Sequence, residues 1–151
     1  EINIQLLMTL NELALIYTTL GRHNDAENLF QEVINSLSKL SDLQPDTAIA
    51  LGNLAIGFRK SRQFQKAIPA HDRAVKIMST ILGKENHETI YQRAQYAVTL
   101  IHSGDEIKGM QMLQEALQQM EKLGLRSDHI WVRMFKPELK NVGRRVGDSL
   151  L

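Results

Sequence analysis

One apolar pattern occurs three times along this chain, and that repetition limits the possible folds more than any other feature. The stretch "LALIYTTLGRHNDA" (Leu13–Ala26) returns 41 residues later as "LAIGFRKSRQFQKA" (Leu54–Ala67). A Leu-Ala pair, an aromatic residue and a closing Ala keep their columns, while nearly every polar residue changes. A third, less regular copy follows 42 residues further on, around Tyr96 and Ala97. A fixed period of this length is typical of repeat architectures, in which each unit is one supersecondary element.

The apolar residues of each copy recur at helical spacing. No segment alternates strictly with the period of a strand, and the 151 residues include only three prolines. Apolar residues three and four apart lie on one face of a helix, so the pattern predicts an all-α chain. We expect the repeat helices at residues 5–20, 23–40, 47–61, 64–82, 87–103 and 106–123.

Small residues hold matching columns in the two helices of every pair. In the first helix these are Ala14, Ala55 and Ala97. We expect them where the second helix crosses the first, because a larger side chain would push the backbones apart. From the second helix, Ala26, Ala67 and Gly109 are expected to do the same.

Glycine and proline mark the expected helix ends. Gly21, Gly83, Gly104 and Gly124 follow the expected helices, where a left-handed terminating residue is favourable. Asp46-Thr47 is expected to cap the third helix. Pro137 is expected to break the C-terminal segment or to begin a new helix there, because proline lacks the amide donor.

The repeated skeleton resembles the tetratricopeptide repeat, in its longer, kinesin light chain-like form of 41–42 residues. "ILGKENHETI" (Ile81–Ile90) resembles the linker of that form, and "GNLA" (Gly52–Ala55) resembles the opening of its first helix. The resemblance implies a right-handed α-α superhelix, or solenoid, of about three helix-turn-helix repeats plus a C-terminal capping helix. We expect a single domain over residues 1–151, with repeats at about 5–46, 47–86 and 87–128 and a cap at 129–151. Because the chain begins at Glu1 rather than Met, we also expect it to be a fragment of a larger protein.

The resemblance also implies a binding surface, since the first helix of each tetratricopeptide pair lines a concave groove. Asn53 stands out, because an amide side chain can donate to and accept from an extended peptide backbone at once. A basic corner at Arg59, Lys60 and His102 would favour an acidic residue or a terminal carboxylate. The alternative is that Arg59 and Lys60 form a solvated helix end stabilised by the helix dipole. The expected peptide-binding residues are Asn11, Glu12, Leu15, Asn53, Ile56, Arg59, Lys60, Gln95, Val98 and His102.

The predicted function is a protein–protein interaction scaffold that binds a partner peptide or subunit through this groove. One alternative is an assembly module that packs through its convex face or its C-terminal end, where Met110 and Met120 lie, and self-association stays open. A second alternative is nucleic-acid contact through Arg133–Arg145, which holds five basic residues and one acid. That stretch lacks aromatic residues at base-stacking spacing, so nucleic acid is the less favoured partner. The sequence does not identify the partner.

Enzymatic and metal sites find no support in the sequence. The chain has no Cys, and none of its five His residues lies four positions from another. His71 is instead expected in the core, and no phosphate-binding loop occurs. We therefore expect no catalytic activity, cofactor or metal. The net charge is +1 and no apolar run reaches the length of a bilayer, so we predict no membrane span and a cytoplasmic location.

Overall fold

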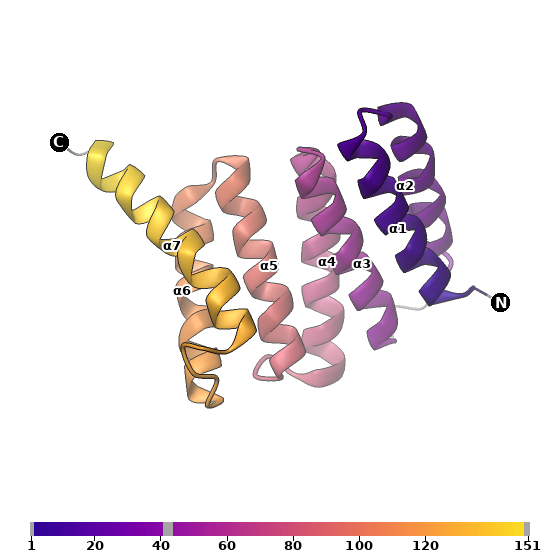
Figure 1. Ribbon diagram of the computed structural model, residues 1–151. Helices are drawn as coiled ribbons and strands as arrows, with labels where there is room; N and C mark the ends of the chain where they lie inside the picture. Colours follow the sequence, from indigo (N-terminus) through magenta and orange to yellow (C-terminus); the bar gives the residue numbers. More distant parts are fainter. Residues whose placement is uncertain (1, 41–43, 150–151) are drawn as a thin grey trace. The chain divides into compact units, whose positions relative to one another are not determined.

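The computed structural model describes residues 2–40 and 44–149, and within them the chain forms seven α-helices joined by short loops, without a strand (Figure 1). The all-α prediction is confirmed, and each predicted repeat helix lies within three residues of an observed one. The expected linker at 41–43 and the last two residues of the expected cap lie outside the described part. The helices are α1 (Ile4–Thr19), α2 (His23–Leu37), α3 (Pro45–Lys60), α4 (Phe64–Leu82), α5 (His87–Ser103), α6 (Glu106–Lys122) and α7 (Ile130–Ser149).

The chain forms two compact units, which we call unit 1 (Glu1–Ile81) and unit 2 (Leu82–Leu151). Unit 1 holds α1 to α4, and unit 2 holds α5 to α7. Each unit has a hydrophobic core of its own. That the two units form one domain remains a prediction.

Asparagine and glycine residues mark several helix ends. The Asn3 and Asn86 side chains each accept a hydrogen bond from a backbone amide in the first turn of α1 and α5, at 3.2 and 2.9 Å. Such caps satisfy amides that have no partner inside the helix. The backbone φ angle is positive at all four terminating glycines, as predicted: Gly21, Gly83, Gly104 and Gly124.

Two predictions about helices that contain proline are wrong: the cap of the third helix and the break at Pro137. Helix α3 begins at Pro45 with Gln44 as its N-cap, so Asp46 and Thr47 lie inside the helix rather than capping it. Proline suits the first helical position, where its fixed φ is already helical and no amide is needed. Helix α7 runs unbroken through Pro137. It continues because apolar side chains are buried on both sides of the proline, at Phe135 and Val142.

The core of unit 1 is built around two aromatic rings. Phe30 of α2 and Phe58 of α3 are fully buried, and their ring centroids lie 4.9 Å apart. The small columns are buried as predicted, with Ala14 and Ala67 showing no exposed surface. Helix α1 packs against both α2 and α3. Fully burying a Phe side chain contributes about 1.5–3 kcal/mol relative to leaving it exposed, so this pair stabilises the junction of α2 and α3.

The core of unit 2 depends on one close helix crossing. A Cβ atom added at Gly109 of α6 would lie 2.8 Å from the carbonyl oxygen of Ala97 in α5. This crossing therefore requires a glycine, as the small-residue column predicts. Leu113, Met120 and Phe135 fill the space around it.

Helix α7 closes unit 2 by packing on α5 and α6 (Figure 1). The ring of Tyr91 in α5 lies 4.8 Å from that of Trp131 and 5.8 Å from that of Phe135, measured between centroids. Trp131 and Phe135 thus pack on Tyr91 of the third helix pair. No helix in the described ranges has both the length and the apolar character that a bilayer crossing needs.

Candidate functional site

Seven of the predicted peptide-binding residues lie on α1 and α3 of unit 1, and six of them share one surface. The Asn11 side chain bonds to α3 at Asn53, and the Thr18 hydroxyl bonds to that of Ser61, so the two helices run parallel with an offset of 42–43 residues. Parallel helices in this register bring matching columns to one surface. We call this surface the α1–α3 face. Two of its residues, Glu12 and Lys60, are exposed. The other four are half-buried: Leu15, Asn53, Ile56 and Arg59.

Asn11, the seventh predicted residue of unit 1, joins the two helices instead of facing outward. It is 4% exposed, and its Nδ2 donates to the backbone oxygen of Asn53 at 2.9 Å. A Cβ at Gly57 would lie 2.8 Å from Asn11 Oδ1, so glycine makes room for this amide. The sequence carried a signal for this role, because the same column holds Gly52 and Ala94 in the other repeats.

Asn53 offers an unused amide on this surface. Its backbone oxygen is held by Asn11, while its side chain makes no hydrogen bond to any described residue. The side chain is half-buried, so water reaches it only in part. One donor and one acceptor are therefore available side by side on a rigid helix.

Arg59 and Lys60, at the basic end of the α1–α3 face, lie in different environments. His71 of α4 is fully buried, as predicted. Burial, and then the positive charge of Arg59, lower the pKa of His71 to about 3, so the imidazole is neutral at physiological pH. Arg59 therefore lies close enough to act on the interior of unit 1. Lys60 is exposed and makes no ion pair with a described residue.

The three predicted residues of α5 are engaged within the fold. Gln95 and Val98 are each 4% exposed, and Gln95 Nε2 donates to the Tyr91 hydroxyl at 2.9 Å. His102 Nε2 lies 3.1 Å from Glu138 Oε2 of α7. A ligand could reach Gln95 and Val98 only if they became exposed, and it would compete with Glu138 for His102.

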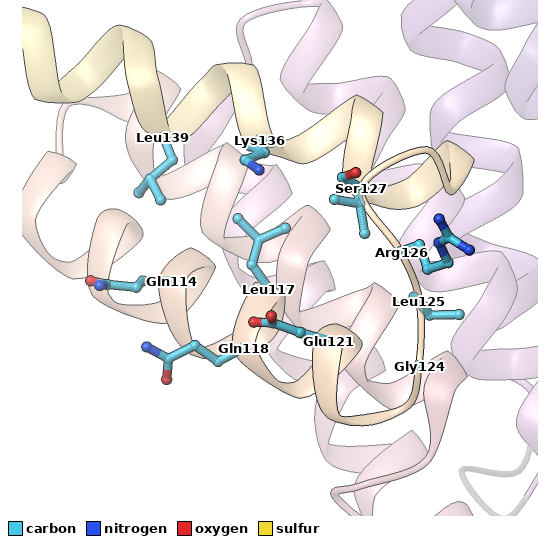
Figure 2. A pocket seen from close by; sticks show the side chains of 11 residues that line it. Gln114, Leu117, Gln118, Glu121, Gly124, Leu125, Arg126, Ser127, Lys136 and Leu139 are labelled. Carbon is cyan, nitrogen blue, oxygen red and sulfur yellow. The ribbon is translucent and has the colours of Figure 1, made fainter.

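The structure shows a hollow in unit 2 that the sequence does not predict. A hollow of about 580 Å³ lies between α6, the loop that follows it and α7 (Figure 2). We call it the α6–α7 hollow. Its apolar lining residues hold positions that helical periodicity assigns to packing, so periodicity does not reveal a cavity there. It is lined by Gln114, Leu117, Gln118, Glu121, Gly124, Leu125, Arg126, Ser127, Val132, Lys136 and Leu139.

Metal chemistry has no visible site in the described ranges, 2–40 and 44–149. No group of three or more His, Asp or Glu side chains there could hold an ion. The candidate surfaces consist of amides, aliphatic side chains and cations.

The comparison with protein families decides the classification. The sequence profile of the tetratricopeptide repeat matches residues 5–80, just over half of the chain. The chain belongs to the tetratricopeptide repeat family. The match covers all of α2 and α3 and nearly all of α1 and α4, so it includes both helices that carry the α1–α3 face. Tetratricopeptide repeats are generally protein–protein interaction scaffolds and are typically non-enzymatic.

Solved structures show the same tetratricopeptide architecture. The chain is similar to nearly identical TPR-like repeats that are ascribed to a kinesin light chain of Podosopora anserina, with a TM-score of 0.80 at 21% identity. The match covers 97% of this chain and 70% of that one. It confirms the predicted solenoid class. Among curated proteins, the sequence has no match.

Proposed function

We propose that this chain binds an extended segment of a partner protein across the α1–α3 face of unit 1. The observation that carries the proposal is Asn53, whose side-chain amide lies on a rigid helix without a hydrogen-bond partner among the described residues. An amide in this state can pair with both polar groups of one peptide unit. The general role of tetratricopeptide repeats as protein-binding scaffolds supports it.

The neighbours of Asn53 define what kind of peptide would bind. Leu15 and Ile56 are half-buried aliphatic side chains in matching columns, and they offer contact to an apolar side chain. Lys60 adds an exposed positive charge one helical turn from Ile56. The face therefore favours a peptide with an apolar residue near an acidic residue or a terminal carboxylate.

A displayed library of random peptides, selected on the wild-type chain, tests the proposal. We expect selected peptides to lose at least tenfold in affinity when Asn53→Ala and Lys60→Glu are combined. Losing a hydrogen-bonded amide costs about 1–3 kcal/mol, and 1.4 kcal/mol corresponds to a factor of ten. The matched control is Asn28→Ala with Lys39→Glu, two exposed residues outside the face. The proposal is defeated if the selected peptides bind the Asn53→Ala, Lys60→Glu variant as tightly as they bind the control, provided circular dichroism shows that both variants fold.

The methionines of the C-terminal end give no support to the assembly alternative. Met120 has no exposed surface, and Met110 is half-buried against the core of unit 2. These methionines therefore fill the core, so substitutions there would test folding rather than an interface.

A further inference from the structure

The α6–α7 hollow combines an apolar floor with a polar rim. Leu117 of α6 and Leu139 of α7 point toward one another across it (Figure 2). Leu125 and Val132 extend this floor, while glutamine side chains stand at the outer edge of α6. Among the described residues, no further element covers the hollow. A volume of about 580 Å³ is within the range of ligand sites and gives room for apolar side chains of a binding partner.

A row of four cations runs along α7 beside this hollow, and we call it the basic row. Its members are exposed and follow one another at intervals of three or four residues, which keeps them on one side of the helix. None of them makes an ion pair with a described residue. The one carboxylate within this stretch, Glu138, is engaged by His102 on α5. The basic row consists of Arg133, Lys136, Lys140 and Arg144.

The hollow and the basic row are continuous. Lys136 and Ser127 line the hollow and also line a second, shallower depression whose other members include Arg133, Lys140 and Arg144. A molecule seated in the hollow would thus place its flank against unpaired positive charge. Complementary charge around an apolar centre is the arrangement that gives a docking surface its specificity.

We propose that the α6–α7 hollow and the basic row together dock an amphipathic, acidic helical segment of a partner protein. Apolar residues on one side of such a helix fill the floor between Leu117 and Leu139. Acidic residues on its flank pair with Lys136, Lys140 and Arg144. This surface lies within unit 2, so it is separate from the α1–α3 face and does not depend on the function proposed for that face.

The composition of the surface argues against the other anionic partners. Nucleic-acid single strands need aromatic side chains on which the bases stack, and no aromatic residue lines the hollow or the second depression. Trp131, the one tryptophan of the chain, packs on Tyr91 instead. A duplex or a lipid headgroup would engage the cations but would leave the apolar floor unused.

Fluorescence anisotropy with three labelled 18-residue peptides tests the proposal on the whole chain at 150 mM salt. The first peptide has a leucine stripe flanked by glutamates. The second replaces the glutamates by lysines, and the third replaces the leucines by serines. We expect measurable binding of the first peptide and at least tenfold weaker binding of the other two. A 20-base-pair DNA duplex and vesicles with phosphatidylserine serve as the competing anionic probes.

Substitutions in the chain test where the first peptide binds. Lys136→Glu with Lys140→Glu should weaken the first peptide at least tenfold, and Gln118→Trp should do so by filling the hollow from its exposed edge. The matched control is Lys84→Glu with Lys108→Glu, which reverses two exposed lysines of unit 2 away from the hollow. The proposal is overturned if the control weakens binding as much, if the serine peptide binds equally well, or if DNA or vesicles bind more tightly than the first peptide.

Discussion

His71 is a titratable residue in a column that Phe30 occupies one repeat earlier. Burial and Arg59 lower its pKa from the ordinary 6.5 to about 3 in the folded chain. Between these two values the unfolded chain binds a proton that the folded chain excludes. The stability of the fold therefore falls as the pH decreases through this window, by up to about 1.4 kcal/mol per pH unit.

Replacing His71 by Phe should remove this pH dependence. Phenylalanine does not titrate, and the first repeat buries it in the same column. We expect the wild-type chain to lose about 2 kcal/mol of unfolding free energy between pH 7 and pH 5 relative to His71→Phe. Urea denaturation followed by circular dichroism at several pH values measures it. His23→Gln, at an exposed histidine, should behave as the wild type does, and parallel curves for all three proteins would contradict the assignment.

Two glycines within helices should respond to alanine with opposite signs. At Gly109 a Cβ would meet backbone atoms of α5 at 2.8 Å, whereas at Gly143 of α7 nothing lies within 4 Å. Gly143→Ala should stabilise the chain by up to about 1 kcal/mol, which is the difference in helix propensity. Gly109→Ala should destabilise it by about 1–3 kcal/mol, because overpacking outweighs that gain. Thermal melts of both variants check the signs, and a stabilising Gly109→Ala would show that α5 and α6 can separate without cost.

At the scale of single residues, repetition predicts packing, whereas it does not predict individual hydrogen bonds. The columns of Ala14, Ala97 and Gly109 were identified because the repeat shows three versions of each. The roles of Asn11 and Gln95 depended on hydrogen bonds to Asn53 and Tyr91 that periodicity does not reveal. The sequence does not distinguish a helical amide side chain that hydrogen-bonds to a neighbouring helix from one that has no partner in the fold.

Proline substitutions distinguish the start of a helix from its interior. Pro137→Ala restores an amide that can bond within α7, so we expect it to raise the unfolding free energy, by at most about 3 kcal/mol. Pro45→Ala at the first position of α3 should instead lower it, by about 0.4–1 kcal/mol, because the unfolded chain gains freedom. Hydrogen exchange of the amides after residue 137 measures the first effect locally. Slower exchange there is expected, and unchanged exchange would mean that the turn at Pro137 is already as stable as a regular one.

At the scale of helices, most helix ends follow from local residues, whereas the course of α7 depends on tertiary packing. Periodicity and the terminating glycines placed six helices closely. The passage of α7 through Pro137 could not be predicted in the same way, because it depends on the burial of Phe135 and Val142. The pairing of His102 with Glu138 likewise joins residues 36 positions apart on different helices.

At the scale of the whole molecule, the contacts divide the chain near residue 81. The buried cluster of unit 1 runs from Leu7 to Met78, and that of unit 2 runs from Ile90 to Val142. The tetratricopeptide profile matches residues 5–80 and so coincides with unit 1. A core that closes on itself is what an independently folding segment needs.

We therefore expect fragments 1–81 and 82–151 to fold separately. Each should show helical circular dichroism and a cooperative melt, at a lower temperature than the whole chain, because smaller units bury a smaller share of their surface. Trp131 belongs to unit 2 and packs on Tyr91, so fragment 82–151 should keep the tryptophan emission maximum of the whole chain. Fragment 1–60 is the control, since it lacks α4 and with it the buried Ala67 and Met78, and it should not melt cooperatively. If fragment 1–81 were as disordered as fragment 1–60, unit 1 would not fold independently, although its core makes its own contacts. Each unit would then need its neighbour for stability, as repeats in a solenoid commonly do.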